Sequence, residues 1–219
     1  MKMKGGDFKI SLRNFQATLF QNAQDRNSII YLPTGTGKTR IAICSMYYYL
    51  CKYGTSKKIV FLANTIQLVK QQAEAIKQTL THIVQNEAFA RDLRQRLGEN
   101  YIQLHWNEKD IYNQVVCVHG ERTEDQTVTK RKRIEAYLTS KKEYINTMKK
   151  ATVTCMISQM FLNCLRRGYI KLTDYSFVVF DECHHCGGDH PFSGIMKEFY
   201  FEQKRKMIKD EKEHKLKED

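Results

Sequence analysis

Residues 28–39 have the sequence SIIYLPTGTGKT, in which a short apolar run stops at Pro33 and a glycine-rich turn ends in Gly-Lys-Thr. The apolar run predicts a buried strand over 28–32, because a few consecutive apolar residues bounded by a proline are typical of one. Residues 38–53 then place apolar side chains on a wide helical face, which predicts a helix. The order of strand, glycine-rich turn and helix indicates that this segment opens an α/β fold.

The turn at 32–39, LPTGTGKT, departs from the phosphate-binding pattern GxxxxGK[ST] at its first position, where Leu32 replaces glycine. Gly35 and Gly37 would let backbone N–H groups turn toward phosphate oxygens, where a Cβ would block them. Lys38 would place a positive charge on the β- and γ-phosphates, and Thr39 would offer its hydroxyl to magnesium. The alternative is a glycine-rich turn without a ligand, but its place between a strand and a helix favours ATP with Mg²⁺. The expected nucleotide-binding residues of the loop are Pro33, Thr34, Gly35, Thr36, Gly37, Lys38 and Thr39.

The rest of the chain alternates two kinds of apolar pattern. Helical spacing occurs over 13–23, 66–76 and 160–165, and residues 128–150 combine a helical pattern with high positive charge. Short apolar runs predict four more strands, over 59–63, 115–118, 153–157 and 177–180. Strands that alternate with helices predict a parallel sheet covered by helices on both faces, so the fold class is α/β. Ligands of such folds bind at the carboxyl ends of the strands.

Two carboxylates, Asp181 and Glu182, follow the last of these predicted strands. Asp181 would hold magnesium, usually through water, and Glu182 would polarise the attacking water as general base. An Asp-Glu pair alone is weak evidence, since many such pairs lie on surfaces. Its place at a strand end, downstream of a phosphate-binding loop, favours catalysis. The expected catalytic residues are therefore Lys38, Asp181 and Glu182, with Thr39 and Asp181 as magnesium ligands.

A zinc site is the competing interpretation of the same region. Cys183, His184, His185 and Cys186, with His190 nearby, offer several zinc-binding side chains in a short span. A structural zinc site normally needs a second pair of ligands, and the sequence has no other Cys-x-x-Cys. The sequence therefore favours the catalytic interpretation over zinc.

Composition and charge limit the class of protein. The start of the chain is too polar for a signal peptide, no apolar run is long enough to span a membrane, and seven cysteines are scattered without a disulfide pattern. We expect an intracellular protein, in the cytoplasm or the nucleus, with reduced thiols and no membrane partner. The net charge of +12 favours a polyanionic partner. The densest basic run, 130–133, would contact RNA phosphates or form a solvated face, and the solvated face is the commoner outcome.

Together these motifs resemble a known family. LPTGTGKT followed by DECHH is similar to the first RecA-like domain of superfamily 2 helicases of the DExH kind, which implies a RecA-like P-loop NTPase fold. The segment LRNFQ at 12–16 resembles the nucleotide-sensing Q motif, which implies that Gln16 reads the adenine edge and that Arg13 supports it. Residues 63–65 and 154–159 resemble two motifs that contact the nucleic-acid backbone, which implies RNA contacts for Thr65 and Gln159.

Within that family, one stretch is similar to the helicase region of Dicer. It consists of RGYI (167–170), LTD (172–174), FDECHH (180–185), DHPF (189–192) and IMK (195–197). The resemblance covers most of residues 10–200. It implies ATP hydrolysis stimulated by double-stranded RNA, in small-RNA processing.

The sequence departs from the family in what it does not contain. We find no SAT-like motif after DECHH, no second RecA-like domain, and no PAZ or ribonuclease III domains in the 219 residues. Arginines that accelerate phosphoryl transfer by ~10³–10⁵ would come from the second domain. We therefore expect weak ATP binding and very slow hydrolysis from this chain alone. The expected partners are double-stranded RNA and a second helicase domain, or the rest of a Dicer-type protein.

The expected organisation is one ATP-binding helicase domain over 1–200 and a charged tail over 201–219, helical or disordered. Residues 85–114 would form an insertion or two irregular helices. Two other functions stay open: a non-catalytic RNA-binding or regulatory module that keeps the ATPase motifs, and a DNA-directed superfamily 2 ATPase.

Overall fold

A computed structural model describes residues 12–97, 99, 101–118 and 142–218. The chain divides into two compact units. The first unit contains residues 1–56 and 74–113, and the second contains residues 57–73 and 114–219. Each unit is described by itself below.

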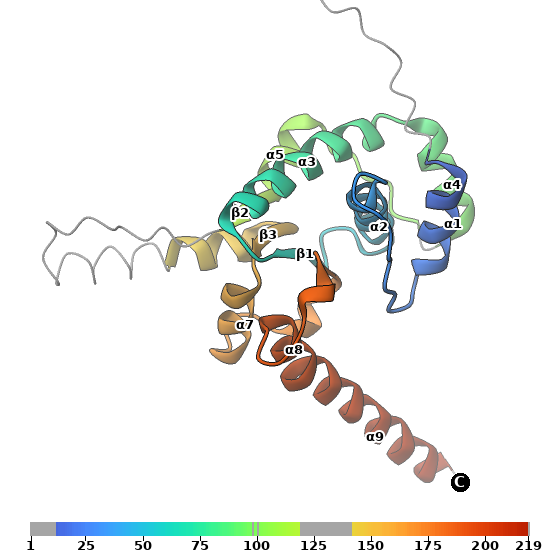
Figure 1. The fold of residues 1–219 in the computed structure, drawn as a ribbon. Coiled ribbons are helices and arrows are strands. Elements are labelled where there is room, and N and C mark those ends of the chain that lie inside the picture. The colour runs from blue at the N-terminus through green and yellow to red at the C-terminus, as the bar shows by residue number, and fades with distance from the viewer. Residues whose placement is uncertain (1–11, 98, 100, 119–141, 219) are drawn as a thin grey trace, which may run out of the picture. The chain divides into compact units, whose positions relative to one another are not determined.

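The second unit is built on a parallel sheet of four strands (Figure 1). The strands are β1 (Lys58–Ala63), β2 (Val115–Val118), β3 (Val153–Ile157) and β4 (Tyr175–Phe180), in the spatial order β2-β3-β1-β4. Every pair of neighbours is parallel. This arrangement confirms the α/β class that the alternating pattern predicted, and the four strands lie where the sequence placed them to within two residues.

Helices α7 (Ser158–Arg166) and α8 (Pro191–Ile195) enclose the core on one face of this sheet. Val60, Leu62 and Met156 of the sheet pack there with Phe161 of α7 and Phe192 of α8. The two helices approach so closely that a Cβ on Gly194 would lie 2.8 Å from Leu162 Cδ2. Residues 59, 61, 63, 153 and 155 point to the other face and are also buried, so both faces of the central strands are covered.

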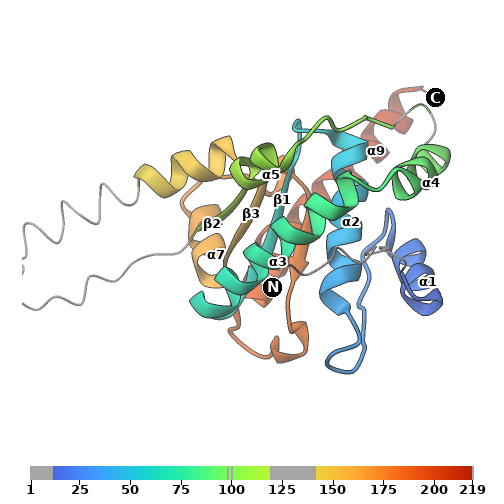
Figure 2. The same cartoon turned by 90° about the horizontal axis from the view of Figure 1, so that it is seen from above.

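The first unit is helical and centres on α2 (Lys38–Tyr53). Helices α1 (Asn14–Ala23) and α4 (Glu87–Leu97) lie beside it (Figure 2), and α5 (Glu108–Gln114) completes the unit. Phe89 of α4 packs on Phe20 of α1 and on Tyr47 of α2, with ring centroids 6.0 and 5.9 Å apart. Helix α3 (Ile66–Val84) begins in the second unit and ends in the first.

The three consecutive tyrosines of α2 test an expectation from the sequence. Their sequence predicts at least two of them in the core, because they follow the glycine-rich loop on one helix. Tyr47, Tyr48 and Tyr49 are 2%, 4% and 8% exposed, so all three are buried. They are therefore not exposed stacking surfaces for bases.

The predicted strand over 28–32 is wrong. These residues form no strand, and Ile29 and Tyr31 are 85% and 90% exposed. The apolar composition favours a strand, but a strand also needs a neighbour that completes its ladder of hydrogen bonds. Within the described residues the sheet ends at β4, which pairs with β1 on one side.

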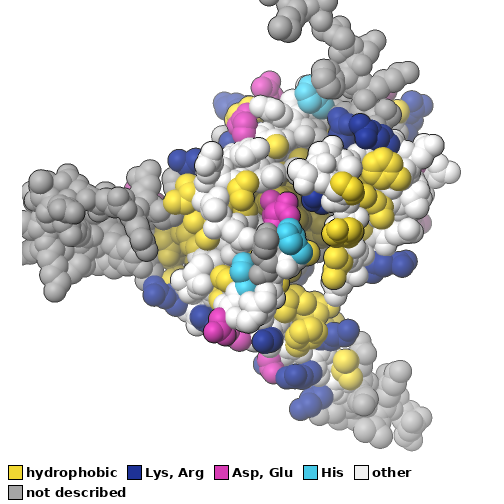
Figure 3. Space-filling model, viewed as in Figure 1, with side chains coloured by type: hydrophobic (Ala, Val, Ile, Leu, Met, Phe, Trp, Pro, Cys, Tyr) yellow, Lys and Arg dark blue, Asp and Glu magenta, His cyan; other side chains and the backbone are white. Residues whose placement is uncertain are grey.

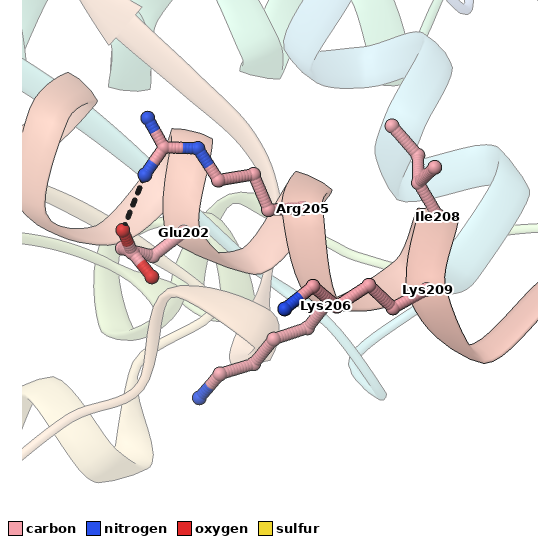
Figure 4. A pocket seen from close by; sticks show the side chains of 5 residues that line it. All are labelled: Glu202, Arg205, Lys206, Ile208 and Lys209. Carbon is pink, nitrogen blue, oxygen red and sulfur yellow. Dashed lines mark hydrogen bonds and ion pairs between the residues drawn. The ribbon is translucent and has the colours of Figure 1, made fainter.

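Residues 85–114 contain the helices α4 and α5. The C-terminal segment is also helical: a π-helical turn over Met196–Tyr200 continues into α9 (Phe201–Glu218). Lysine and arginine side chains line the visible part of α9 in Figure 3. A pocket on α9 is lined by exposed residues of that helix alone (Figure 4): Glu202, Arg205, Lys206, Ile208 and Lys209. None of the helices that the structure describes is long and apolar enough to cross a bilayer.

Candidate functional site

The glycine-rich loop of the first unit has the backbone that a phosphate cradle needs. Gly35 and Gly37 have φ values of +80° and +93°, in the left-handed region that side chains disfavour. A Cβ on Gly35 would meet no atom within 4 Å, so this side of the loop is open. Helix α2 begins at Lys38 with Gly37 as its N-cap. The first N–H groups of a helix have no acceptor within it and attract anions.

Side chains of the loop fold back onto its own carbonyl groups. Lys38 Nζ donates to Leu32 O at 3.0 Å, and Thr36 Oγ1 donates to Pro33 O at 2.6 Å. Thr39 follows in the first turn of α2 and is half-buried, while Pro33 and Thr34 are exposed. The ammonium group thus lies over the loop, where it is able to exchange a carbonyl for a phosphate oxygen.

The side chain of Gln16 of α1 forms a hydrogen bond to this loop. The side chain is 3% exposed, its Nε2 donates to Thr36 O at 2.8 Å, and its Oε1 accepts from Arg13 N at 2.9 Å. The structure therefore brings Gln16 to the loop across 20 positions of sequence. These two bonds use one N–H and one lone pair of the amide. The adenine contacts of Gln16 and of the exposed Arg13 remain predictions.

The close packing of Gln16 against Gly37 gives a testable result. A Cβ on Gly37 would lie 2.5 Å from Gln16 Nε2, whereas a Cβ on Gly168, at φ +67°, would meet nothing within 4 Å. We expect Gly168→Ala to lower the free energy of unfolding by about 1 kcal/mol through backbone strain alone. Gly37→Ala adds a steric clash and should cost about 2–3 kcal/mol. Denaturant unfolding of both variants measures the difference, and equal losses would contradict a packed Gln16–Gly37 contact.

In the second unit, the two predicted carboxylates lie at the carboxyl end of β4. Asp181 N donates to Leu62 O of β1 at 2.9 Å, which continues the ladder one residue past the strand. Glu182 follows with φ +51°, an uncommon conformation for a side chain of this kind. Its carboxylate lies 3.3 Å from His184 Nδ1 and is 43% exposed. Figure 3 shows acidic and histidine side chains next to each other on the visible face.

The residues predicted to contact RNA lie at the same edge of the sheet. Ala63 of β1 is in register with Ile157 of β3, and Thr65 and Gln159 each follow two residues later. Both are exposed, and between their strands Ser158 Oγ lies 3.5 Å from Asn64 Oδ1. The carboxyl ends of β3, β1 and β4 therefore present Gln159, Thr65 and Asp181 along one edge.

Thr65 also has a structural task that Gln159 does not share. Thr65 Oγ1 accepts from Leu68 N at 3.2 Å at the start of α3, whereas Gln159 Nε2 donates to Asn163 on the surface of α7 at 3.0 Å. We expect Thr65→Ala to lower the free energy of unfolding by about 1 kcal/mol, and Gln159→Ala to change it by less than about 0.5 kcal/mol. If Thr65 and Gln159 both contact RNA, each substitution should weaken the binding of double-stranded RNA about three- to tenfold. Thermal unfolding and fluorescence anisotropy with a labelled duplex separate the two effects. Unchanged RNA affinity in Gln159→Ala would remove that residue from the interface.

The Cys-His-His-Cys segment forms a 3₁₀ turn (Cys183–His185) closed by Cys186 N donating to Cys183 O at 3.1 Å. Both cysteines pack against the apolar core, and burial raises the pKa of Cys186. His190 Nδ1 accepts from Phe192 N at 3.3 Å and so caps α8, with Pro191 in its first turn. The described residues contain no group of three or more His, Cys, Asp or Glu suited to a metal. All seven cysteines are thiols.

The basic run at 130–133 lies outside the described residues. Two features of the structure were not predicted from the sequence. One is the contact between Asn64 and Ser158, which belong to the two segments, 63–65 and 154–159, that resemble motifs contacting the nucleic-acid backbone. The other is Asp25. The only indication of it in the sequence is the turn-forming composition of residues 25–27, Asp-Arg-Asn.

Comparison with known proteins places the chain in a family. Residues 9–210 match the family model described as "Type III restriction enzyme, res subunit". The chain is 30% identical over 192 residues to Endoribonuclease Dicer homolog 4 of Oryza sativa subsp. japonica, and 28% identical over 193 residues to Endoribonuclease Dicer homolog 2 of Arabidopsis thaliana. These matches cover 86% and 87% of the chain, but only 9% and 11% of the two relatives. Endoribonuclease dcr-1 of Caenorhabditis elegans is 27% identical over 206 residues, which is 90% of the chain and 8% of that protein.

A solved structure is similar as well. The helicase domain of Hef from Pyrococcus furiosus matches with a TM-score of 0.58 and 27% identity, over 86% of this chain and 30% of that one. The chain thus spans about a tenth of the length of its Dicer relatives and under a third of the Hef chain.

Proposed function

Because this chain belongs to the family described as the res subunit of type III restriction enzymes, we propose that it is an ATP-binding helicase domain of Dicer type that acts on double-stranded RNA. The family match, the similarity to Dicer homologues and the similarity to the Hef helicase domain identify a superfamily 2 helicase domain. Beyond this, we propose that the domain uses ATP and magnesium and binds double-stranded RNA.

The structure of the glycine-rich loop is the main support for nucleotide binding. Its two glycines adopt left-handed backbone, the side of Gly35 is open, and Lys38 already donates to an oxygen of the loop. A triphosphate fits this donor set, because its oxygens need backbone N–H groups and a positive charge. Residues 33–39 would hold the phosphates, and Gln16 and Arg13 would lie on the base side.

The donors proposed for magnesium are the Thr39 hydroxyl and the Asp181 carboxylate, both of the oxygen type that Mg²⁺ prefers. When bound, the ion would neutralise charge on the phosphates. Glu182 would accept a proton from the attacking water. These roles rest on the motifs of the sequence, and the exposure of Glu182 is consistent with access to water.

Binding to RNA is proposed for Thr65 and Gln159, which are exposed just after the neighbouring strands β1 and β3. The net charge of +12 would add affinity that is independent of sequence and sensitive to salt. The names of the relatives, endoribonucleases of the Dicer group, favour RNA over DNA as the partner. We also propose that hydrolysis by residues 1–219 alone is slow, because the arginines that accelerate phosphoryl transfer would come from a second helicase domain.

Titration of ATP with and without nucleic acid tests the proposal. We expect ATP binding whose affinity or single-turnover hydrolysis rate changes with a double-stranded RNA but not with the matching DNA duplex. Absence of ATP binding would overturn the proposal. Stimulation by DNA alone would favour a DNA-directed ATPase, and binding without any response to nucleic acid would favour a regulatory module. Turnover near one per second with RNA would contradict the expected slow hydrolysis.

A further inference from the structure

We propose that Asp25 is a positioning residue that anchors α1 on α2, so that Gln16 at the other end of α1 holds the phosphate loop in place. The inference rests on the proposed nucleotide site of the first unit. It assigns to Asp25 an effect on a loop that it does not touch. We call Asp25 with Tyr48, Tyr49 and Lys52 the Asp25 anchor.

The anchor is a set of hydrogen bonds that converge on one residue. Tyr48 Oη donates to Asp25 Oδ2 at 2.6 Å, Lys52 Nζ donates to Asp25 Oδ1 at 2.6 Å, and Asp25 N donates to Tyr49 Oη at 3.2 Å. Lys52 Nζ also lies 5.8 Å and 5.7 Å from the ring centroids of Tyr48 and Tyr53. Both carboxylate oxygens and the backbone of Asp25 are therefore tied to the C-terminal half of α2.

The backbone and the charge of Asp25 are both compatible with the anchor. Its φ is +55°, a left-handed conformation that aspartate adopts more readily than most residues with a side chain. Burial opposes its charge, yet the hydrogen bonds from Lys52 and Tyr48 outweigh that effect and lower the pKa of Asp25. The carboxylate is thus charged and paired at neutral pH.

Helix α1 needs such attachments because it is short. A helix of 10 residues is marginal on its own in water. α1 is held at three points: Gln16 on Thr36 O near its start, the buried ring of Phe20 in its middle, and the Asp25 anchor just past its end. Release of the anchor lets α1 pivot on Phe20, and that motion loosens the bond between Gln16 and the loop.

The test compares Asp25→Ala, Asp25→Asn and a control, Thr18→Ala. Thr18 is exposed on α1 and its hydroxyl bonds to Asn14 O of the same helix, so it should leave the anchor intact. The half-exposed Lys52–Asp25 pair is a modest interaction, so Asp25→Ala should weaken nucleotide binding about three- to fivefold. Asparagine tolerates the left-handed backbone and keeps an acceptor for Tyr48, so Asp25→Asn should restore part of the affinity. Thr18→Ala should leave the affinity unchanged.

A merely structural role is excluded by two further readouts. Hydrogen exchange of the amides at 35–38 should speed up in Asp25→Ala and not in Thr18→Ala. In a Gln16→Ala background, Asp25→Ala should have no further effect on nucleotide affinity, because the link between α1 and the loop is already cut. Faster exchange in α1 with unchanged exchange in the loop would overturn the inference. So would an equal loss of affinity in both backgrounds.

The exchange measurement needs no nucleotide. If the wild-type chain binds no ATP, the proposed function fails, and exchange at 35–38 still decides whether the Asp25 anchor positions the loop.

Discussion

Replacement of Glu182 by Gln is expected to slow ATP hydrolysis by about 10²-fold and to leave ATP affinity nearly unchanged. A carboxylate removes a proton from water, and an amide of the same shape does not. The side chain is 43% exposed and contacts His184, so the change should leave the fold intact. Single-turnover hydrolysis of labelled ATP, followed over hours because the expected rate is low, measures the effect.

Glu202→Gln is the matched control for Glu182→Gln. Glu202 is an exposed glutamate of α9, paired with Arg205 at 2.6 Å, and it belongs to none of the motifs. We expect wild-type hydrolysis from this variant. Equal rates in Glu182→Gln and the wild type would show that Glu182 is not the general base.

Lys38→Ala is expected to weaken ATP binding by about 10²-fold, since a charged hydrogen bond of this kind contributes roughly 1.5–3 kcal/mol. In the structure Lys38 Nζ donates to Leu32 O, a bond within the loop that an anion is able to replace. Removal of the ammonium group leaves the phosphates with backbone N–H groups alone. Isothermal titration with ATP and Mg²⁺ measures the change.

Lys70→Ala controls for the loss of one positive charge. Lys70 is exposed on α3 and belongs to the second unit. Its removal should leave ATP affinity at the wild-type value. If Lys38→Ala binds ATP with an affinity within a factor of two of the wild type, the loop is not the ATP site that we propose. A factor of two corresponds to about 0.4 kcal/mol of binding free energy.

The two central strands of the sheet, β1 and β3, were predictable because they are buried on both faces. Such strands have nearly continuous apolar runs, which are a local property of the sequence. Residues 58–63 and 153–157 are examples, and almost every side chain in them is buried. The order β2-β3-β1-β4 was not predictable from those runs, because which strands become neighbours depends on contacts between distant segments.

Residues 28–32 show the limit of the same reasoning. Their composition is as apolar as that of a strand, yet Ile29 and Tyr31 are almost fully exposed. The apolar pattern of a segment indicates only its preference for a strand. Whether the segment pairs with the sheet depends on a sheet edge that is free and on whether the chain runs alongside that edge. The turn at Pro33, by contrast, was predicted correctly from local chemistry, because proline fixes its own φ and the two glycines permit a left-handed backbone that other residues disfavour.

By itself, the sequence determined the α/β class, the glycine-rich turn that precedes the helix with Lys38, and the placement of Asp181, Thr65 and Gln159 after strands. These are local facts, since residue type and spacing along a strand or turn set them. Only the tertiary structure decided that Gln16 packs against Gly37, that strand register brings Thr65 and Gln159 to one edge, and that Asp25 ties α1 to α2. Each of those contacts joins residues about 20 to 100 positions apart, and no local pattern encodes a contact that the folded chain alone creates.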